Sequence, residues 1–344
     1  MASLLQIKVT ERLADELGRE PTQAEIENGM VAPWTLAYLH NELNVGQSIF
    51  SIDNTQNIQD SIDIIEDAGG GTLYLKGGTY NQSSDISIPS NILVQGVGSG
   101  GTIIDFGNSA HSINIIGTSG AHLTSPSLIG VTIQNTSSYG VRIDYVDNFL
   151  GKDIEVNNAD IGLYATNITV MNLDTLISDS CGTAVKIEDS TGLTVNNLAI
   201  EGTTSGGACV FNNIQSMTFI NSSIGSGIGN GITLDSCYDI TVDSYSVIEV
   251  TGIGISLIDS SVIACSSGAI VDCTGDGIKL DGTSSCQILT TNFTDNGGYG
   301  VNILDATCEN NLFAINDFSG NSSGAMDDNG TGTLVRSNIG LADN

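Results

Sequence analysis

Residues 140–148 read GVRIDYVDN, a small residue followed by an apolar, a variable and a second apolar residue. The same arrangement returns at intervals of 22 to 25 residues toward the end of the chain. The small residues that open these units are Gly140, Gly162, Ala184, Ala208, Gly231, Gly254, Gly277, Gly300 and Ala325. A period of this length indicates a tandem array of structural repeats, in which each unit packs on its neighbours.

Each unit predicts one coil of a parallel β-solenoid. It contains two or three short runs rich in β-branched residues, and turn residues separate these runs. A second run recurs downstream of the first, as in LTVNNLAI (193–200) and ITVDSYSV (240–247). The composition agrees, because 42 Gly, 4 Pro and only 14% charged residues favour strands joined by many tight turns.

The chain upstream of Val141 predicts the same architecture with less regular coils. TLYLKGGTY (72–80), TIIDFG (102–107) and INIIG (113–117) have the pattern of strands. Residues 55–68 (TQNIQDSIDIIEDA) instead carry apolar residues at helical spacing, between a Thr and a run of Gly. Because the first coil of a solenoid exposes unpaired strand edges and apolar surface, we expect this helix to cap it. The β-helix domain is therefore predicted to cover residues 51–344, with regular coils from residue 141.

The first 50 residues differ from the rest of the chain. VTERLADELG (9–18) and PWTLAYLHNEL (33–43) predict two helices, and the second contains the only Trp. They could pack on the capping helix, or they could form a separate docking or oligomerisation segment. We assign residues 1–50 to such a segment as a hypothesis.

The charge and the cysteines restrict the partners. A net charge of −30 disfavours binding to nucleic acid or to an anionic membrane surface, since both depend on Lys and Arg. No stretch has the pattern of a secretory signal peptide or of a membrane-spanning helix, so we expect neither a signal peptide nor membrane insertion. The seven cysteines lack zinc-type spacing, and we expect Cys181, Cys209, Cys237 and Cys265 to fill interior positions.

The second and fourth residues of each unit are predicted to point outward on one sheet. Three of the nine Lys and Arg residues therefore share a single face. Since adjacent coils lie ~4.8 Å apart, Arg142 and Lys186 should be separated by about 10 Å, with Tyr164 between them. The pairs down the stack are Arg142/Asp144, Tyr164/Thr166, Lys186/Glu188, Val210/Asn212, Thr233/Asp235, Ser256/Ile258, Lys279/Asp281 and Asn302/Leu304.

Three interpretations of this face remain open. In the first it is catalytic, with Arg142 or Lys186 abstracting a proton, Tyr164 donating one, and Asp144 with Glu188 forming an acid–base pair. Those two carboxylates would be ~10 Å apart, near the upper end of the roughly 6.5–9.5 Å range of inverting glycosidases. In the second it binds a glycan without turnover. In the third, Arg142–Asp144 and Lys186–Glu188 are ordinary surface ion pairs.

A metal site is a further candidate on the same face. Asp235 and Asp281 are predicted to lie two coils apart and could hold Ca²⁺ together with Asp259 or Asp276. Calcium prefers six to eight oxygen ligands, and neither an EF-hand loop nor a GGxGxD series is present. No other cofactor is predicted.

The predicted helix is followed by AGGGTLYLKGGTY (68–80) and SIPSNILVQGVGSGGTIIDF (87–106), an order that resembles the entry segment of the pectate-lyase-like right-handed parallel β-helix superfamily. The resemblance spans roughly residues 50–340 and implies an all-β, single-stranded right-handed parallel β-helix. The superfamily includes polysaccharide lyases, hydrolases, epimerases, phage tailspikes and inert binding proteins, so it does not fix the chemistry. The catalytic elements typical of polygalacturonases and the DPHE-like element of mannuronan epimerases are absent.

The resemblance and the absence of a complete catalytic motif favour a viral surface or tail spike protein that binds cell-surface polysaccharide, noncatalytic or weakly catalytic. Such spikes are usually homotrimers, and residues 1–50 would contact other virion proteins. The expected location is extracellular, at the virion surface. The alternatives are a polysaccharide lyase or glycoside hydrolase, and a purely structural virion decoration protein.

Overall fold

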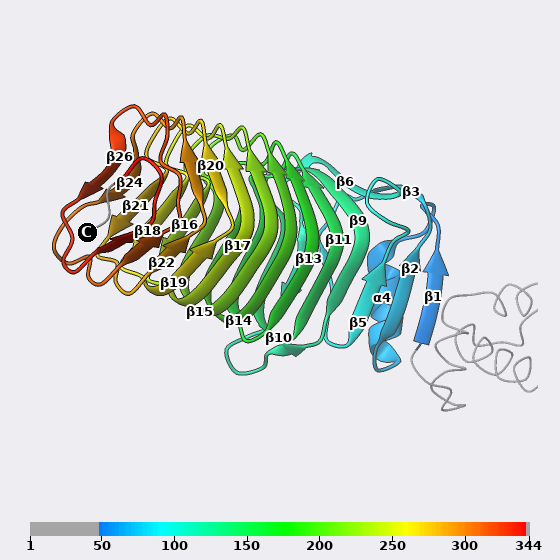
Figure 1. Ribbon diagram of the computed structural model, residues 1–344. Coiled ribbons are helices and arrows are strands. Elements are labelled where there is room, and N and C mark those ends of the chain that lie inside the picture. Colours follow the sequence, from blue (N-terminus) through cyan, green and yellow to red (C-terminus); the bar gives the residue numbers. More distant parts are fainter. Residues whose placement is uncertain (1–47, 342–344) are drawn as a thin grey trace, which may run out of the picture.

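The computed structural model describes residues 48–341, which form a right-handed parallel β-helix. Its coils stack along one axis from β1 at one end to β26 at the other (Figure 1). Each regular coil passes through three sheets, here called I, II and III, and paired strands within each sheet are parallel. The predicted fold class is therefore confirmed.

Sheet I contains the first strand of each repeat unit. Its members, in stacking order, are β4 (Ile86–Ser87), β7 (Ile113–Ile116), β10 (Tyr139–Asp147), β12 (Ile161–Ile168), the first parts of β14 (Thr183–Glu201) and β15 (Gly207–Gly225), β16 (Ile232–Asp235), β18 (Ile255–Ile258), β21 (Ile278–Asp281), β24 (Tyr299–Ile303) and β26 (Gly324–Asp328). The short strand β8 (Leu123–Thr124) pairs with the end of β10.

Sheets II and III complete the coils. Sheet II contains β1 (Ser48–Ile52), β2 (Gly71–Leu75), β5 (Ile92–Gln95), parts of β9 (Ser127–Thr136), β11 (Phe149–Asn157), β13 (Met171–Asp179), β14, β15 and β17 (Tyr238–Ile248), and then β19 (Ser261–Ser266), β22 (Gln287–Leu289), β25 (Leu312–Ala314) and β27 (Leu334–Arg336). Sheet III begins with β3 (Gly78–Asn81) and β6 (Thr102–Ser109). It continues with the last parts of β9, β11, β13, β14, β15 and β17, and then with β20 (Ala269–Val271) and β23 (Asn292–Thr294).

The register of sheet I follows the repeat residue by residue. Val141 pairs with Leu163, and Leu163 with Val185, and all three side chains are fully buried. The alternate positions form an outward column in which Arg142 pairs with Tyr164, and Tyr164 with Lys186. Successive strand residues point to opposite faces, so one register fixes both the core and the exposed row.

The small residue that opens each unit lies at a tight corner between sheets. A Cβ atom on Gly254 would lie 2.2 Å from Ile270 Cγ2 and 2.6 Å from the carbonyl oxygen of Gly277. Gly231 and Gly277 are enclosed in the same way, each by a side chain of its own coil and by the carbonyl oxygen of the next corner glycine. The sequence repeat therefore marks corners that leave little room for a larger side chain.

Helix α4 (Ile58–Asp67) forms at the predicted position, with Ile58, Ile62 and Ile65 buried against the first coils. It begins later than expected, since Asn57 is the N-cap and accepts a hydrogen bond from the backbone N–H of Asp60. The expected first residue, Thr55, instead donates its hydroxyl to Asp53. An Asx-type turn thus precedes the helix and delays its first turn.

All seven cysteines are buried and free, as expected for the four assigned to the core. The predicted helices of the first 50 residues, and the docking segment assigned to them, fall almost entirely outside the described residues. Within residues 48–341, no helix is long and apolar enough to cross a membrane.

The corner geometry gives a stability prediction. Gly254→Ala should lower the free energy of unfolding by about 1–3 kcal/mol, because its new methyl group must displace Ile270 or the backbone of the next coil. Gly120→Ala is the matched control, since no atom lies within 4 Å of the added Cβ, and its effect should stay within about 0.5 kcal/mol. Urea unfolding of both variants measures the difference, and equal stabilities would contradict the corner argument.

Candidate functional site

Two cationic and two aromatic side chains lie in contact on the outer face of sheet I. The rings of Tyr139 and Tyr164 have centroids 5.2 Å apart. The guanidinium carbon of Arg142 lies 5.7 Å from the Tyr139 centroid, and Nζ of Lys186 lies 5.7 Å from the Tyr164 centroid. Cations at this distance are attracted to the negative face of a ring. We call Tyr139, Arg142, Tyr164 and Lys186 the cation–aromatic row.

Glu188 is the polar centre at one end of this row. Its carboxylate lies 3.1 Å from Nζ of Lys186 and accepts hydrogen bonds from the hydroxyl of Tyr164 at 2.9 Å and from the amide of Asn212 at 3.2 Å. Three residues from successive coils thus converge on one carboxylate. The expected Lys186–Glu188 ion pair is present, but it belongs to a network and is only partly exposed.

Arg142 differs from Lys186 because it lacks a carboxylate partner. The expected Arg142–Asp144 ion pair is wrong: within residues 48–341, no carboxylate oxygen lies within 4.0 Å of the guanidinium. Asp144 instead accepts a hydrogen bond from the amide of Asn167. The Nε atom of Arg142 is buried without a hydrogen-bond partner in this part of the chain. A guanidinium carries five donors, and the four on the two Nη atoms of Arg142 also make no hydrogen bond within residues 48–341, so these four are the donors that can bind a ligand.

The network shifts the pKa values of its two acidic groups in opposite directions. Partial burial, the hydrogen bond to Glu188 and the charge of that carboxylate raise the pKa of Tyr164 to about 12. Partial burial opposes ionisation of Glu188 as well, but hydrogen bonds from Lys186, Tyr164 and Asn212 outweigh it and hold the pKa of this carboxyl below its ordinary value. At neutral pH the phenol is protonated and the carboxylate is charged.

These protonation states limit the chemistry of the predicted acid–base pair. An inverting hydrolase needs one carboxylic acid whose pKa is raised so that it can protonate the leaving group. The pKa of Glu188 is lowered instead, and its oxygens already accept three hydrogen bonds. The register places Thr166 between Asp144 and Glu188, so the two carboxylates are two coils apart as expected.

The predicted calcium ligands are separated by an apolar residue. Asp235 pairs with Ile258, which in turn pairs with Asp281. Asp276, a possible third ligand, accepts hydrogen bonds from the backbone N–H of Tyr299 and from the amide of Asn302. In the described part of the chain, no three His, Cys, Asp or Glu side chains gather into a metal site. The calcium interpretation gains no support from the geometry and stays a prediction.

Sequence reasoning found most of the row but missed three partners. Tyr139 precedes the corner residue Gly140 and so falls outside the repeat unit, although its ring contacts Tyr164. Asn212 and Asn167 were not assigned a role, although each binds a candidate carboxylate. An outward position directly beside Glu188 in the next coil was the signal that could have identified Asn212.

The comparisons with known proteins agree with the architecture. The family described as the right-handed beta helix region matches residues 111–272. The chain thus has a right-handed parallel β-helix fold, as the resemblance implied. Comparison with curated protein sequences gives no match.

Several solved structures share this fold at low sequence identity. The A-module of the mannuronan C-5 epimerase AlgE4 from Azotobacter vinelandii is 16% identical with a TM-score of 0.52, covering 82% of this chain and 90% of that one. The periplasmic alginate epimerase AlgG is 13% identical with a TM-score of 0.58, covering 91% and 88%. ORF18 of Geobacillus virus E2 is 17% identical with a TM-score of 0.57, covering 85% of this chain and 62% of that one. At these identities the likeness concerns the fold.

The lowered pKa of Glu188 gives a pH-dependent prediction. A carboxyl whose folded pKa is depressed stabilises the protein above its unfolded pKa of about 4.3, and this stabilisation is lost as the pH falls through the folded pKa. The urea midpoint of the wild type should exceed that of Glu188→Gln at neutral pH, and the gap should narrow below about pH 4. Glu201→Gln, on the same strand but exposed, should show no such pH-dependent gap. A gap that widens in acid would refute the assignment.

Proposed function

We propose that this chain is a glycan-binding surface protein of the viral spike type, noncatalytic or weakly catalytic, and that the cation–aromatic row is its contact face. The observation that carries the proposal is the unpaired guanidinium of Arg142 over the ring of Tyr139, which itself contacts the ring of Tyr164, in a chain of net charge −30. Aromatic faces pack against the apolar faces of sugar rings, and guanidinium donors bind hydroxyl or carboxylate oxygens.

The proteins of similar fold support this proposal. Two of them are named as epimerases of mannuronan and alginate, which are polysaccharides, and one is a viral protein. A stacked-coil face can accommodate an extended chain, because equivalent positions repeat every ~4.8 Å along the axis. These likenesses concern the fold alone, so the proposal of glycan binding depends on the cation–aromatic row.

The proposal includes partners and a location. The ligand is a cell-surface polysaccharide, residues 1–50 attach the protein to other virion proteins, and the spike is a homotrimer outside the cell. The acidic surface disfavours nucleic acid as a competing ligand. A strongly acidic glycan would also be repelled except where Arg142 or bridging cations neutralise its groups.

Binding can be tested with a panel of alginate, polygalacturonate, xylan, mannan and dextran. We expect the wild type to bind at least one of them, and Arg142→Ala and Tyr164→Ala to weaken that binding by about tenfold or more. Lys279→Ala is the matched control, because Lys279 occupies the same outward column four coils beyond Lys186. Isothermal titration calorimetry measures the affinities. Equal losses in the control and the row variants would contradict a role for the row, and a wild type that binds none of the panel favours a structural decoration protein.

A polysaccharide lyase or glycoside hydrolase is the second candidate function. The observation in its favour is that Tyr164, Lys186 and Glu188 are joined by hydrogen bonds, as residues that exchange protons often are. In this reading Lys186 or Arg142 acts as the base, Tyr164 as the acid, and Asp144 with Glu188 as the carboxylate pair.

Turnover separates the two candidates. If the chain is an enzyme, incubation with the same panel will yield unsaturated products or new reducing ends, and Lys186→Ala will abolish them. If it is a binding protein, the polysaccharides will be recovered at their original length although they bind. We expect the second result, because the hydroxyl of Tyr164 is already donated to Glu188 and its pKa is raised to about 12.

A further inference from the structure

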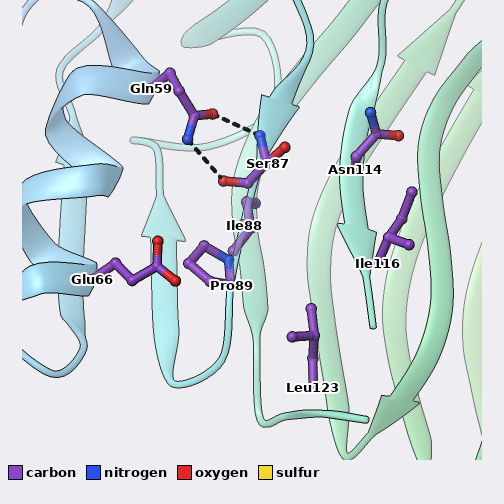
Figure 2. Close-up of a pocket in the computed structure, with 8 residues that line it drawn as sticks. All are labelled: Gln59, Glu66, Ser87, Ile88, Pro89, Asn114, Ile116 and Leu123. Carbon is purple, nitrogen blue, oxygen red and sulfur yellow. Dashed lines mark hydrogen bonds between the residues drawn. The ribbon is translucent and has the colours of Figure 1, made fainter. Parts of the chain in front are cut away.

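Helix α4 takes the place of a strand in sheet I. In the regular coils the chain enters sheet II from a strand of sheet I, whereas β2 is preceded by α4. The side chain of Gln59 accepts a hydrogen bond from the backbone N–H of Ser87 at 2.7 Å and donates to its carbonyl oxygen at 3.4 Å. Figure 2 shows both bonds between the helix and β4. Gln59 thus forms hydrogen bonds with the backbone N–H and C=O groups at the edge of β4, as a neighbouring strand would.

A helix is much thicker than a strand, since its diameter with side chains is about 10–12 Å, so α4 forms a wall at this end of the sheet. A cavity of about 370 Å³ lies between that wall and the outer face of sheet I. Figure 2 shows Gln59 and Glu66 on the helix side and the other lining residues on the strand side. Its volume is within the range of small-ligand sites, about 300–1,000 Å³.

The lining combines apolar surface with a few polar groups. Pro89, Ile116 and Leu123 contribute apolar atoms, and Ile116 is 41% exposed. The amide oxygen of Asn114 accepts from Ser112, but its NH₂ group has no partner among residues 48–341. The Glu66 carboxylate likewise makes no hydrogen bond or ion pair with any described residue. Such a lining fits a small polar molecule with one apolar face, as a sugar has.

The cavity adjoins the cation–aromatic row. Ser87 pairs with Asn114, and Asn114 pairs with Arg142, so the cavity lies one coil from the guanidinium in the same column. In the other outward column Ile116 pairs with Asp144. A glycan that follows the row toward the cap would therefore enter the cavity and meet α4, which blocks further progress along the sheet.

We propose that this cavity is the terminal subsite of the glycan-binding face and holds the last unit of the bound chain, an inference that rests on the proposed function. The unit is uncharged, because the free carboxylate of Glu66 repels a uronate or a sulfated sugar at this position. An acidic group on the adjoining unit is accepted at Arg142. The protein thus binds the ends of its glycan rather than internal stretches.

The first test uses hexasaccharides prepared from the member of the panel that the wild type binds, measured by calorimetry. Ile116→Trp fills the cavity and should weaken binding by about tenfold or more. Leu304→Trp is the matched control, since Leu304 is an exposed apolar residue directly after β24 near the far end of the stack, and it should leave the affinity unchanged. A bulky fluorophore on one end of the hexasaccharide should abolish binding, while the same fluorophore on the other end is tolerated.

The second test uses alginate hexasaccharide, whose terminal units are uronates. Glu66→Gln preserves the shape of the side chain and removes its charge, so this probe should gain about tenfold in affinity. Unchanged binding by Ile116→Trp, tolerance of the fluorophore at both ends, or no gain by Glu66→Gln would each overturn the terminal subsite. If these results accompany a clear loss in Arg142→Ala, the proposed function still holds. If the wild type binds no panel member, both proposals fail.

Discussion

The stacking of coils in a single register is the constraint on which the rest of the structure depends. Each strand of sheet I pairs with the next at a fixed offset, so Val141, Leu163 and Val185 fall on one inner line and Arg142, Tyr164 and Lys186 on one outer line. A shift of one residue would turn the charged side chains into the core. The cost of burying unpaired charges therefore fixes the geometry of the outer row as firmly as hydrophobic burial fixes the core.

The sequence was sufficient to predict the part of the fold that follows from this constraint. The small residue at each corner, the period and the alternation in sheet I each have a local physical cause, and the pairing of Tyr164 with Arg142 and Lys186 follows by counting. The start of α4 did not follow, because Asn57 and Thr55 are both good capping residues and only the turn at Asp53 decides between them.

The side-chain contacts of the candidate site were less predictable, because a long side chain can reach several alternative partners. Arg142 and Asp144 are two residues apart on one face, and simple counting pairs them. In the structure Asn167 donates to Asp144, while Arg142 lies over the ring of Tyr139. Tyr139 precedes the repeat unit, so no pattern of positions identifies it as a partner. Side-chain competition of this kind depends on three-dimensional distances that a repeat alone does not give.

The same register explains why one face carries two environments. Near Lys186 and Glu188 the polar groups satisfy one another, which holds the side chains in place but leaves little capacity for proton transfer. Toward the cap the partners become fewer, with the guanidinium of Arg142 and the NH₂ group of Asn114 both unpaired within the described residues. Unpaired donors beside a cavity can form hydrogen bonds to a ligand. A network whose groups are already hydrogen-bonded instead holds its own side chains in fixed positions. The change occurs at β10 and β7, because the column neighbours of Arg142 are Asn114 and Tyr164, neither of which offers a carboxylate to the guanidinium.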